Sequence, residues 1–182
     1  MVESSVALSR MRRSFRIVGL SLTALFLLCL RPSQAIEPQE VIEQMKKSRP
    51  ANLVVLIKRP DVGGDYLLGM YALKTDKFDQ DLRRFKLWQE WSYDLNVHTE
   101  SVSCSPEEPL RITRDSRAVY VRRLNPGGIV NPANREDHLV WWAACVPELG
   151  GTDPTNLKDK ALSLGYSTVL VESQEVLVGP VR

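Results

Sequence analysis

Apolar and polar residues alternate along residues 85–97, and this is the clearest local pattern in the chain. Apolar or aromatic side chains occupy six of the seven odd positions, with Gln89 as the exception, and Trp88 is the only apolar residue at an even position. A period of two predicts a half-buried β-strand, which is typical of an antiparallel sheet with one solvated face. An alternative for the earlier part is a helix whose apolar face would consist of Phe78, Leu82, Phe85 and Trp88.

Two elements are predicted before this strand. Residues 37–47 carry Pro38 at the start, apolar residues at helical spacing and two lysines at the end, which predicts a short helix. Residues 53–57 form a continuous apolar run, rich in β-branched residues and followed by Arg59-Pro60. This run predicts a short buried strand.

A β-hairpin is predicted after the long strand. Residues 110–114 and 118–124 both have the composition of strands, and Asp115-Ser116 between them has turn chemistry. The sequence Asn-Pro-Gly-Gly at 125–128 then ends the second strand, because it favours a turn and opposes any regular element.

Residues 131–146 are compatible with two conformations. Asn131 as the N-cap and Pro132 at the first helical position would start a helix that runs through Cys145. Residues 138–146 are almost entirely apolar, so a buried strand fits them nearly as well. The capping residues favour the helix by a narrow margin.

The last elements are a helix and one or two strands. Asp153-Pro154 predicts the start of a helix that Gly165 would end, and residues 167–178 read as one strand or as two strands with a turn between them. Together, the elements predict an α+β fold with a mainly antiparallel sheet and a few short helices.

Residues 1–35 predict a cleavable signal peptide. Four arginines precede an apolar run at 17–30, and Arg-Pro-Ser-Gln-Ala at 31–35 ends in a small-x-small cleavage site. The apolar run has 14 residues, whereas a membrane-spanning helix needs roughly 20. Arg12-Arg13-Ser14-Phe15 also resembles the bacterial twin-arginine signal, so ordinary secretion and twin-arginine export both stay open. We expect one mature domain, residues 36–182, in the periplasm or secreted.

The predicted cleavage changes the sign of the net charge. The segment 1–35 holds five basic residues and one acidic residue, so its removal leaves 19 Lys and Arg against 21 Asp and Glu, and the formal charge changes from +2 to −2. A strongly basic surface is the electrostatic requirement for binding nucleic acid. We therefore expect no nucleic-acid partner, and no membrane partner once the signal peptide is removed.

Two cysteines, Cys104 and Cys145, remain after cleavage. An oxidising compartment allows them to form a disulfide, which we predict. A pair of buried free thiols is the alternative. A redox-catalytic role does not fit, because the two cysteines lack the close spacing of Cys-x-x-Cys.

Residues 125–142 hold the richest concentration of side chains suited to a site. If this region binds a ligand, an arginine would hold an anionic group, the histidine could transfer a proton, a carboxylate could orient a partner and a tryptophan could stack on a ring. The alternative is a structural role as helix caps, core residues and ion pairs. The candidate ligand-binding residues are Asn131, Asn134, Arg135, Asp137, His138 and Trp141.

No motif predicts a metal or a cofactor. A site could be imagined from His98 and Glu100, which share one face of the long strand, together with Asp137 and His138, but no spacing of zinc-binding type supports it. The chain has neither a Gly-x-Ser-x-Gly elbow nor a glycine-rich phosphate loop. We expect neither a metal nor a cofactor.

The end of the chain resembles a known family. Ala-Leu-Ser-Leu-Gly-Tyr at 161–166 and Val-Leu-Val-Gly-Pro at 176–180 are similar to the first half of a SPOR domain, over about 40 residues. The second helix and the fourth strand of that family have no counterpart in the sequence. The resemblance implies αββ packing and binding to peptidoglycan glycan strands, which would require an open sheet face near the carboxyl terminus.

These observations lead to two main hypotheses. The first is an exported, non-catalytic accessory protein that binds an envelope protein or a small ligand through residues 125–142. The second is a small hydrolase or lyase that uses His138 and Asp137, with Arg135 for the charge of the substrate. The enzyme requires His138 to be exposed in a concave pocket, whereas the binding protein requires only an accessible surface.

Overall fold

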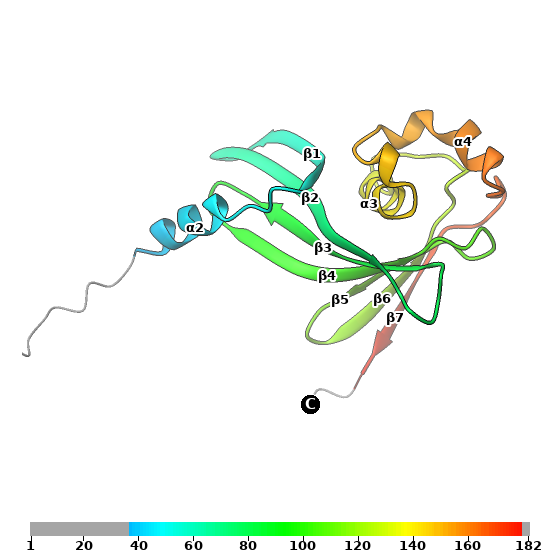
Figure 1. Cartoon of the computed structure of the whole chain (residues 1–182), viewed down its shortest axis with the longest axis horizontal. Coiled ribbons are helices and arrows are strands. Elements are labelled where there is room, and N and C mark those ends of the chain that lie inside the picture. The colour runs from blue at the N-terminus through cyan, green and yellow to red at the C-terminus, as the bar shows by residue number, and fades with distance from the viewer. Residues whose placement is uncertain (1–36, 180–182) are drawn as a thin grey trace, which may run out of the picture. The chain divides into compact units, whose positions relative to one another are not determined.

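The computed structural model describes residues 37–179, so the predicted signal peptide lies outside the described residues. These residues form a seven-stranded antiparallel sheet in which each strand pairs with the next one along the chain (Figure 1). The strands are β1 (Val54–Asp61), β2 (Gly64–Thr75), β3 (Leu82–Glu90), β4 (Leu95–Ser103), β5 (Leu110–Arg114), β6 (Ala118–Arg123) and β7 (Ser173–Val178). The helices are α2 (Pro38–Lys47), α3 (Arg135–Cys145) and α4 (Lys158–Ser163), with short 3-10 turns at Pro147–Leu149 and Pro154–Asn156.

The predicted long strand at 85–97 is wrong, because the chain reverses within it. Residues 91–94 form a turn in which the Trp91 amide donates to the Asp94 carbonyl at 2.9 Å, and β3 and β4 pair on either side. Phe85 and Leu87 face the core as the alternation predicts, and the period of two continues by chance across the turn. The alternative helix is also wrong, since Phe78 is 98 % exposed in an irregular connection.

The first two strands differ from the sequence expectation. The apolar run at 53–57 does form a strand, but β1 lies at the edge of the sheet and continues through Pro60 to Asp61. Only Leu56 of this strand is buried. The buried strand is β2, which the sequence analysis did not find. Its residues 66–70 are all buried because β2 lies between β1 and β3 and beneath α3.

The helical alternative for residues 131–146 is correct. Helix α3 begins at Arg135, three residues later than the predicted start at Pro132. Seven of its eleven residues are buried, including Trp141 and Trp142. An almost wholly apolar segment is a helix here because the sheet covers one side of it and the two 3-10 turns that follow it cover another.

The carboxyl-terminal elements are shorter than expected. The predicted helix at 153–164 is divided into a 3-10 turn and α4, and Gly165, with a φ of 91°, ends it in the left-handed conformation that glycine tolerates. Residues 167–172 form no strand, so β7 is a single strand at the second edge of the sheet. Residues 158–179, as the structure describes them, therefore lack the αββ arrangement of a SPOR half.

The core lies between α3 and one face of the sheet. Trp141 packs edge-on against Trp142 and Tyr166, with ring centroids 5.2 and 5.0 Å apart. The Tyr166 hydroxyl donates to the Cys104 carbonyl at 2.7 Å, and burial raises the pKa of this tyrosine to about 12. The predicted disulfide between Cys104 and Cys145 is confirmed, with 5.5 Å between the two Cα atoms. It joins the end of β4 to the last turn of α3.

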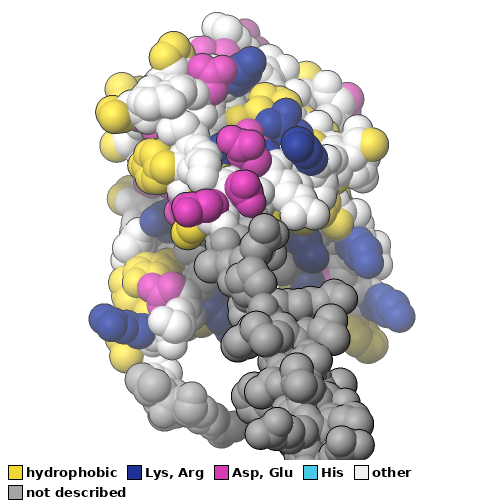
Figure 2. Space-filling model, turned by 90° about the vertical axis from the view of Figure 1, so that its left-hand side faces the viewer, with side chains coloured by type: hydrophobic (Ala, Val, Ile, Leu, Met, Phe, Trp, Pro, Cys, Tyr) yellow, Lys and Arg dark blue, Asp and Glu magenta, His cyan; other side chains and the backbone are white. Residues whose placement is uncertain are grey.

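The surface of the described residues carries charges of both signs. On the face drawn in Figure 2, acidic and basic side chains are interspersed instead of being separated by sign. Among residues 37–179, no helix is both long enough and apolar enough to cross a membrane.

Candidate functional site

The loop before α3 is held by hydrogen bonds from its two asparagines. The Asn131 carboxamide oxygen accepts from the Ala133 amide at 2.8 Å, and the Asn134 carboxamide oxygen accepts from the Asn131 amide at 2.7 Å. These bonds satisfy the Asn131 and Ala133 amides, which precede the helix. The N-cap position belongs to Asn134, whose side chain makes no capping bond to the first turn of the helix.

Glu172 receives three donors at the point where the chain enters β7. Its carboxylate accepts from the Asn125 amide at 3.1 Å, from the Asn134 carboxamide at 2.8 Å and from the Nε2 position of His138 at 2.7 Å. His138 is completely buried, whereas the Glu172 side chain is 31 % exposed. The histidine therefore lies behind the carboxylate and holds it in place.

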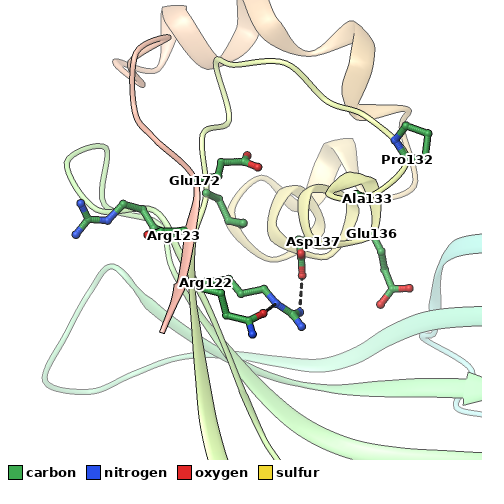
Figure 3. A pocket seen from close by; sticks show the side chains of 10 residues that line it. Arg122, Arg123, Pro132, Ala133, Glu136, Asp137 and Glu172 are labelled. Carbon is green, nitrogen blue, oxygen red and sulfur yellow. Dashed lines mark hydrogen bonds and ion pairs between the residues drawn. The ribbon is translucent and has the colours of Figure 1, made fainter. Parts of the chain in front are cut away.

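A second cluster of charges lies where α3 crosses β4, β5 and β6. The Arg111 guanidinium binds both carboxylate oxygens of Glu100, at 2.8 and 3.1 Å, and also binds Asp137 at 2.7 Å. Asp137 in turn accepts from Arg122 at 3.0 Å, as the dashed line in Figure 3 shows. Glu100 and Arg111 are each only 3 % exposed. The sheet register explains the cluster, because Arg111 pairs with Arg122 and both side chains face α3.

The pKa values of the buried pair show that its members stabilise each other's charge. Burial alone would raise the pKa of Glu100, but hydrogen bonds from His98 and Arg111 and the charge of Arg111 lower it below its usual value. Burial would lower the pKa of Arg111, and the charge of Glu100 more than offsets this effect. Both groups therefore stay ionised inside the protein, as buried charges do only when paired.

Three neighbouring hollows lie at the start of α3, in the loop before it and on the sheet beside it. The central hollow, about 540 Å³, lies between the start of α3 and β6–β7 and is the one drawn in Figure 3. The sheet hollow, about 430 Å³, shares Arg122 with it, and the loop hollow, about 400 Å³, shares Glu172 with it. Because neighbouring hollows share a wall residue, we treat them as one surface and call it the α3 groove.

The α3 groove is polar and carries both charges. Arg122, Arg123 and Glu172 line the central hollow from the sheet side, and Glu136 and Asp137 line it from α3 (Figure 3). The floor of the sheet hollow is formed by Glu100 and Arg111, with amide, imidazole and phenol groups around them. Such a surface favours a ligand with many hydrogen-bonding groups over an apolar one.

Comparison with protein-family models, curated proteins and solved structures found no match for this chain.

The structure places the six candidate residues in different roles. Asn131 and Asn134 line the loop hollow, and Asp137 lines the central one. Arg135 is turned away from these hollows and pairs with Asp153 at 3.0 Å. Trp141 is fully buried, and its indole nitrogen donates to the Ser103 carbonyl at 2.9 Å. His138 reaches the groove only through its bond to Glu172.

The residues imagined as a metal site belong to two separate clusters. His98 lies 2.9 Å from Glu100, as their shared strand face predicts, but the Arg111 guanidinium occupies the space between Glu100 and Asp137. His138 belongs to the Glu172 cluster. Within residues 37–179, histidine, cysteine and carboxylate side chains form no group of three that could hold a metal ion.

The sequence analysis missed Arg111, Arg122 and Glu172. Arg111 and Arg122 are in strands that were predicted, and a charged residue at the inward-facing position of a strand was the available signal. Glu172 gave no signal, because it lies in an irregular segment 34 residues from its histidine partner.

Proposed function

We propose that this protein is an exported, non-catalytic binding protein that recognises a polar envelope component through the α3 groove. The observation that carries this proposal is the complete burial of His138 beside a groove whose accessible groups are paired charges and amides. Six of the ten residues that line the loop hollow come from residues 125–134, within the region that the sequence analysis selected.

The burial of His138 supports binding over catalysis by this residue. A general acid or base must come within hydrogen-bond reach of its substrate. The His138 imidazole is 0 % exposed, and its Nε2 position is engaged by Glu172. The hydrolase or lyase hypothesis therefore receives little support.

The paired charges also favour binding over group transfer. Asp137 is held by Arg111 and Arg122, and Glu172 is held by three donors. Groups that are already fixed can orient the polar groups of a ligand without losing side-chain freedom when they bind. The Glu136 side chain, 43 % exposed and 3.6 Å from Arg111, adds an accessible acceptor.

A glycan is a second candidate class of ligand, favoured by the open face of the sheet at the sheet hollow. The hollow presents the Tyr120 ring together with Gln89, Asn96 and Thr113, and its lining residues lie on β3 to β6 and in the turn between β5 and β6. Hydrogen-bonding amides beside an aromatic ring suit a sugar with hydroxyl and apolar surfaces. Soluble peptidoglycan fragments therefore belong among the probes.

The proposal is tested by thermal unfolding of the oxidised protein with three sets of probes: amino acids and short peptides, oligosaccharides, and soluble muropeptides. A ligand that binds only the folded state stabilises it by about 2.7 kcal/mol at 100 times its dissociation constant. We expect at least one probe to raise Tm. If no probe changes Tm, the proposed recognition of such components is wrong.

A steric block then locates the binding site. Ala133 is exposed and lines the central hollow, so Ala133→Trp should fill the hollow without removing a fold contact. Ala51, exposed in the turn before β1, provides the matched control Ala51→Trp. We expect the effect of the probe on Tm to disappear in the first variant and to persist in the second. An equal effect in both variants would place the binding site outside the central hollow.

A further inference from the structure

The two edges of the sheet differ in how they are protected against pairing with another strand. An edge strand exposes unpaired backbone groups, and proteins usually blunt such edges with bulges, prolines, charges or covering loops. Strand β1 has a register shift between Val55 and Ile57, followed by Lys58, Arg59 and Pro60. This edge is therefore blunted by its own sequence.

A turn also covers the beginning of β1. A Cβ atom placed on Gly151 would lie 2.7 Å from the Val55 carbonyl oxygen, so the backbone of this turn approaches the strand closely. Gly151 has a φ of 83°, a conformation that glycine tolerates, and its missing side chain allows the approach. An added strand would meet this turn.

Strand β7, at the opposite edge, has no bulge and no proline, and Glu175 is its only charged residue. It pairs with β6 in unbroken register from Ser173 to Val178, and its sequence, Ser-Gln-Glu-Val-Leu-Val, contains no proline, lysine or arginine. All six residues are exposed, with Leu177 at 56 % and Val178 at 79 %. Within residues 37–179, no element pairs with its outer side (Figure 1).

Two two-fold axes, at Glu175 and at Val176, would pair nearly the whole of β7 with a second copy, and the charge of β7 selects between them. Two copies of β7 can pair antiparallel around a two-fold axis perpendicular to the sheet. Residues directly opposite each other in an antiparallel pair have their side chains on the same face of the sheet. The axis must therefore pass through a position at which a residue lies opposite its own copy. An axis at Glu175, the only charged residue of β7, would place two carboxylates opposite each other, which is unfavourable. The neighbouring axis, at Val176, places Glu175 opposite Leu177 and Val176 opposite itself.

We infer that the protein forms a homodimer by antiparallel pairing of β7 with β7 of a second copy, with the two-fold axis at Val176. Pairing satisfies the free backbone groups of both edges and covers the exposed valines and leucine of β7. The interface is small, so the association is weak and depends on concentration.

The geometry of this dimer bears on the α3 groove. A two-fold axis perpendicular to the sheet leaves both α3 helices on the same side of the joined sheet. Ser173 and Gln174 of β7 line the central hollow, so the two grooves would open beside the interface. The dimer would present two equivalent sites on one face, which suits a repetitive polymer. The pairing itself does not depend on the proposed ligand.

Sedimentation equilibrium of the oxidised protein tests the inference. The protein is used in the form in which the expressing cell leaves it after any processing. We expect the mean mass to rise with concentration from that of one chain towards that of two. Val176→Lys and Val176→Glu should each weaken association at least about tenfold, because like charges then face each other. An equimolar mixture of the two variants should restore the dimer. A wild-type protein that stays monomeric would overturn the inference, and so would single variants that dimerise normally or a mixture that does not.

Two further measurements separate pairing from a general loss of folding. Val62→Lys introduces the same change at a residue that is 85 % exposed in the turn between β1 and β2, and this variant should dimerise as the wild type does. In the wild-type protein, hydrogen exchange of the β7 amides should slow as concentration increases, while the β1 amides stay unchanged. Exchange in β7 that is independent of concentration would contradict the pairing whatever the variants do.

Discussion

At the scale of single residues, the buried ion pair between Glu100 and Arg111 is the most consequential feature of the site. Both side chains lie under α3, where the cost of removing charge from water is high. Their mutual bonds, together with those from His98 and to Asp137, compensate for that cost. Removing either member therefore leaves the other charged and buried, which lowers the stability of the fold more than the loss of a surface ion pair does.

Glu100→Gln is expected to destabilise the protein by roughly 3–5 kcal/mol near neutral pH, because Arg111 then loses its main counter-charge. Urea unfolding measures the change. The control is Glu175→Gln, the same substitution at an exposed position of the same sheet, which should change the stability by less than about 0.5 kcal/mol. A similar, small effect of both substitutions would show that Glu100 does not compensate Arg111.

The same carboxylate predicts how stability depends on pH. The folded-state pKa of Glu100 is lower than its ordinary value, so the unfolded chain takes up this proton at a higher pH than the folded protein does. The contribution of Glu100 to the stability is complete above its pKa in the unfolded chain, and it is lost as pH falls through its pKa in the folded protein. Unfolding measured from about pH 7 down to about pH 3 should show a steeper loss for the wild type than for Glu100→Gln. Parallel curves would contradict the lowered pKa.

At the scale of elements, the disulfide fixes α3 on the sheet. Cys104 follows β4 directly, and Cys145 ends α3, so the bond joins two layers that are 41 residues apart along the chain. Trp141 reinforces the same junction through its bond to the Ser103 carbonyl. The carboxyl-terminal half of α3 is therefore tied to the sheet, while its amino-terminal half forms one side of the groove.

Replacing both cysteines, in Cys104→Ala/Cys145→Ala, is expected to lower the free energy of unfolding by about 4 kcal/mol in the chain-entropy description of a loop of this length. Guanidinium unfolding of the oxidised wild type and the double variant measures the difference. Reduced wild-type protein, which keeps both cysteines, is the control and should resemble the variant. Equal stability of the oxidised and reduced wild type would mean that the bond does not restrain the unfolded chain.

At the scale of the whole molecule, compartment and charge are linked. Export would remove residues 1–35, change the formal charge from +2 to −2 and place the two mature cysteines where they can oxidise. The disulfide of the folded chain is compatible with such a compartment. The proposed ligand, an envelope component, is compatible with it as well.

We expect the mature protein to begin at Ile36. Expression of the full chain in a bacterium, followed by mass spectrometry of the exported fraction, measures the mass and therefore the cleavage position. Ala35→Arg removes the small residue before the cleavage point and should leave the precursor uncleaved. A wild-type protein that keeps residues 1–35, or that is found only in the cytoplasm with free thiols, would contradict export.

The sequence by itself determined features that depend on residues close together in the chain. The hairpin of β5 and β6 follows from strand composition on both sides of Asp115, whose carboxylate accepts from the Arg117 and Ala118 amides at 2.7 and 2.8 Å. The helix at 38–47 follows from its terminal residues and apolar spacing. The disulfide follows from the predicted cleavage and export, which would leave two cysteines in an oxidising compartment and therefore one possible pair. In each case the decisive interactions are local or are limited by composition.

Only the tertiary structure decided which segments lie together. Periodicity places Phe85 and Leu87 on one face, but it does not show that the chain reverses at residues 91–94 or that β1 lies at an edge. The groove depends on Arg122 and Glu172, which approach α3 from separate parts of the chain. Their partners are chosen by the register of the sheet and by the packing of the helix on it. These depend on long-range contacts, for which a single sequence carries no local signal.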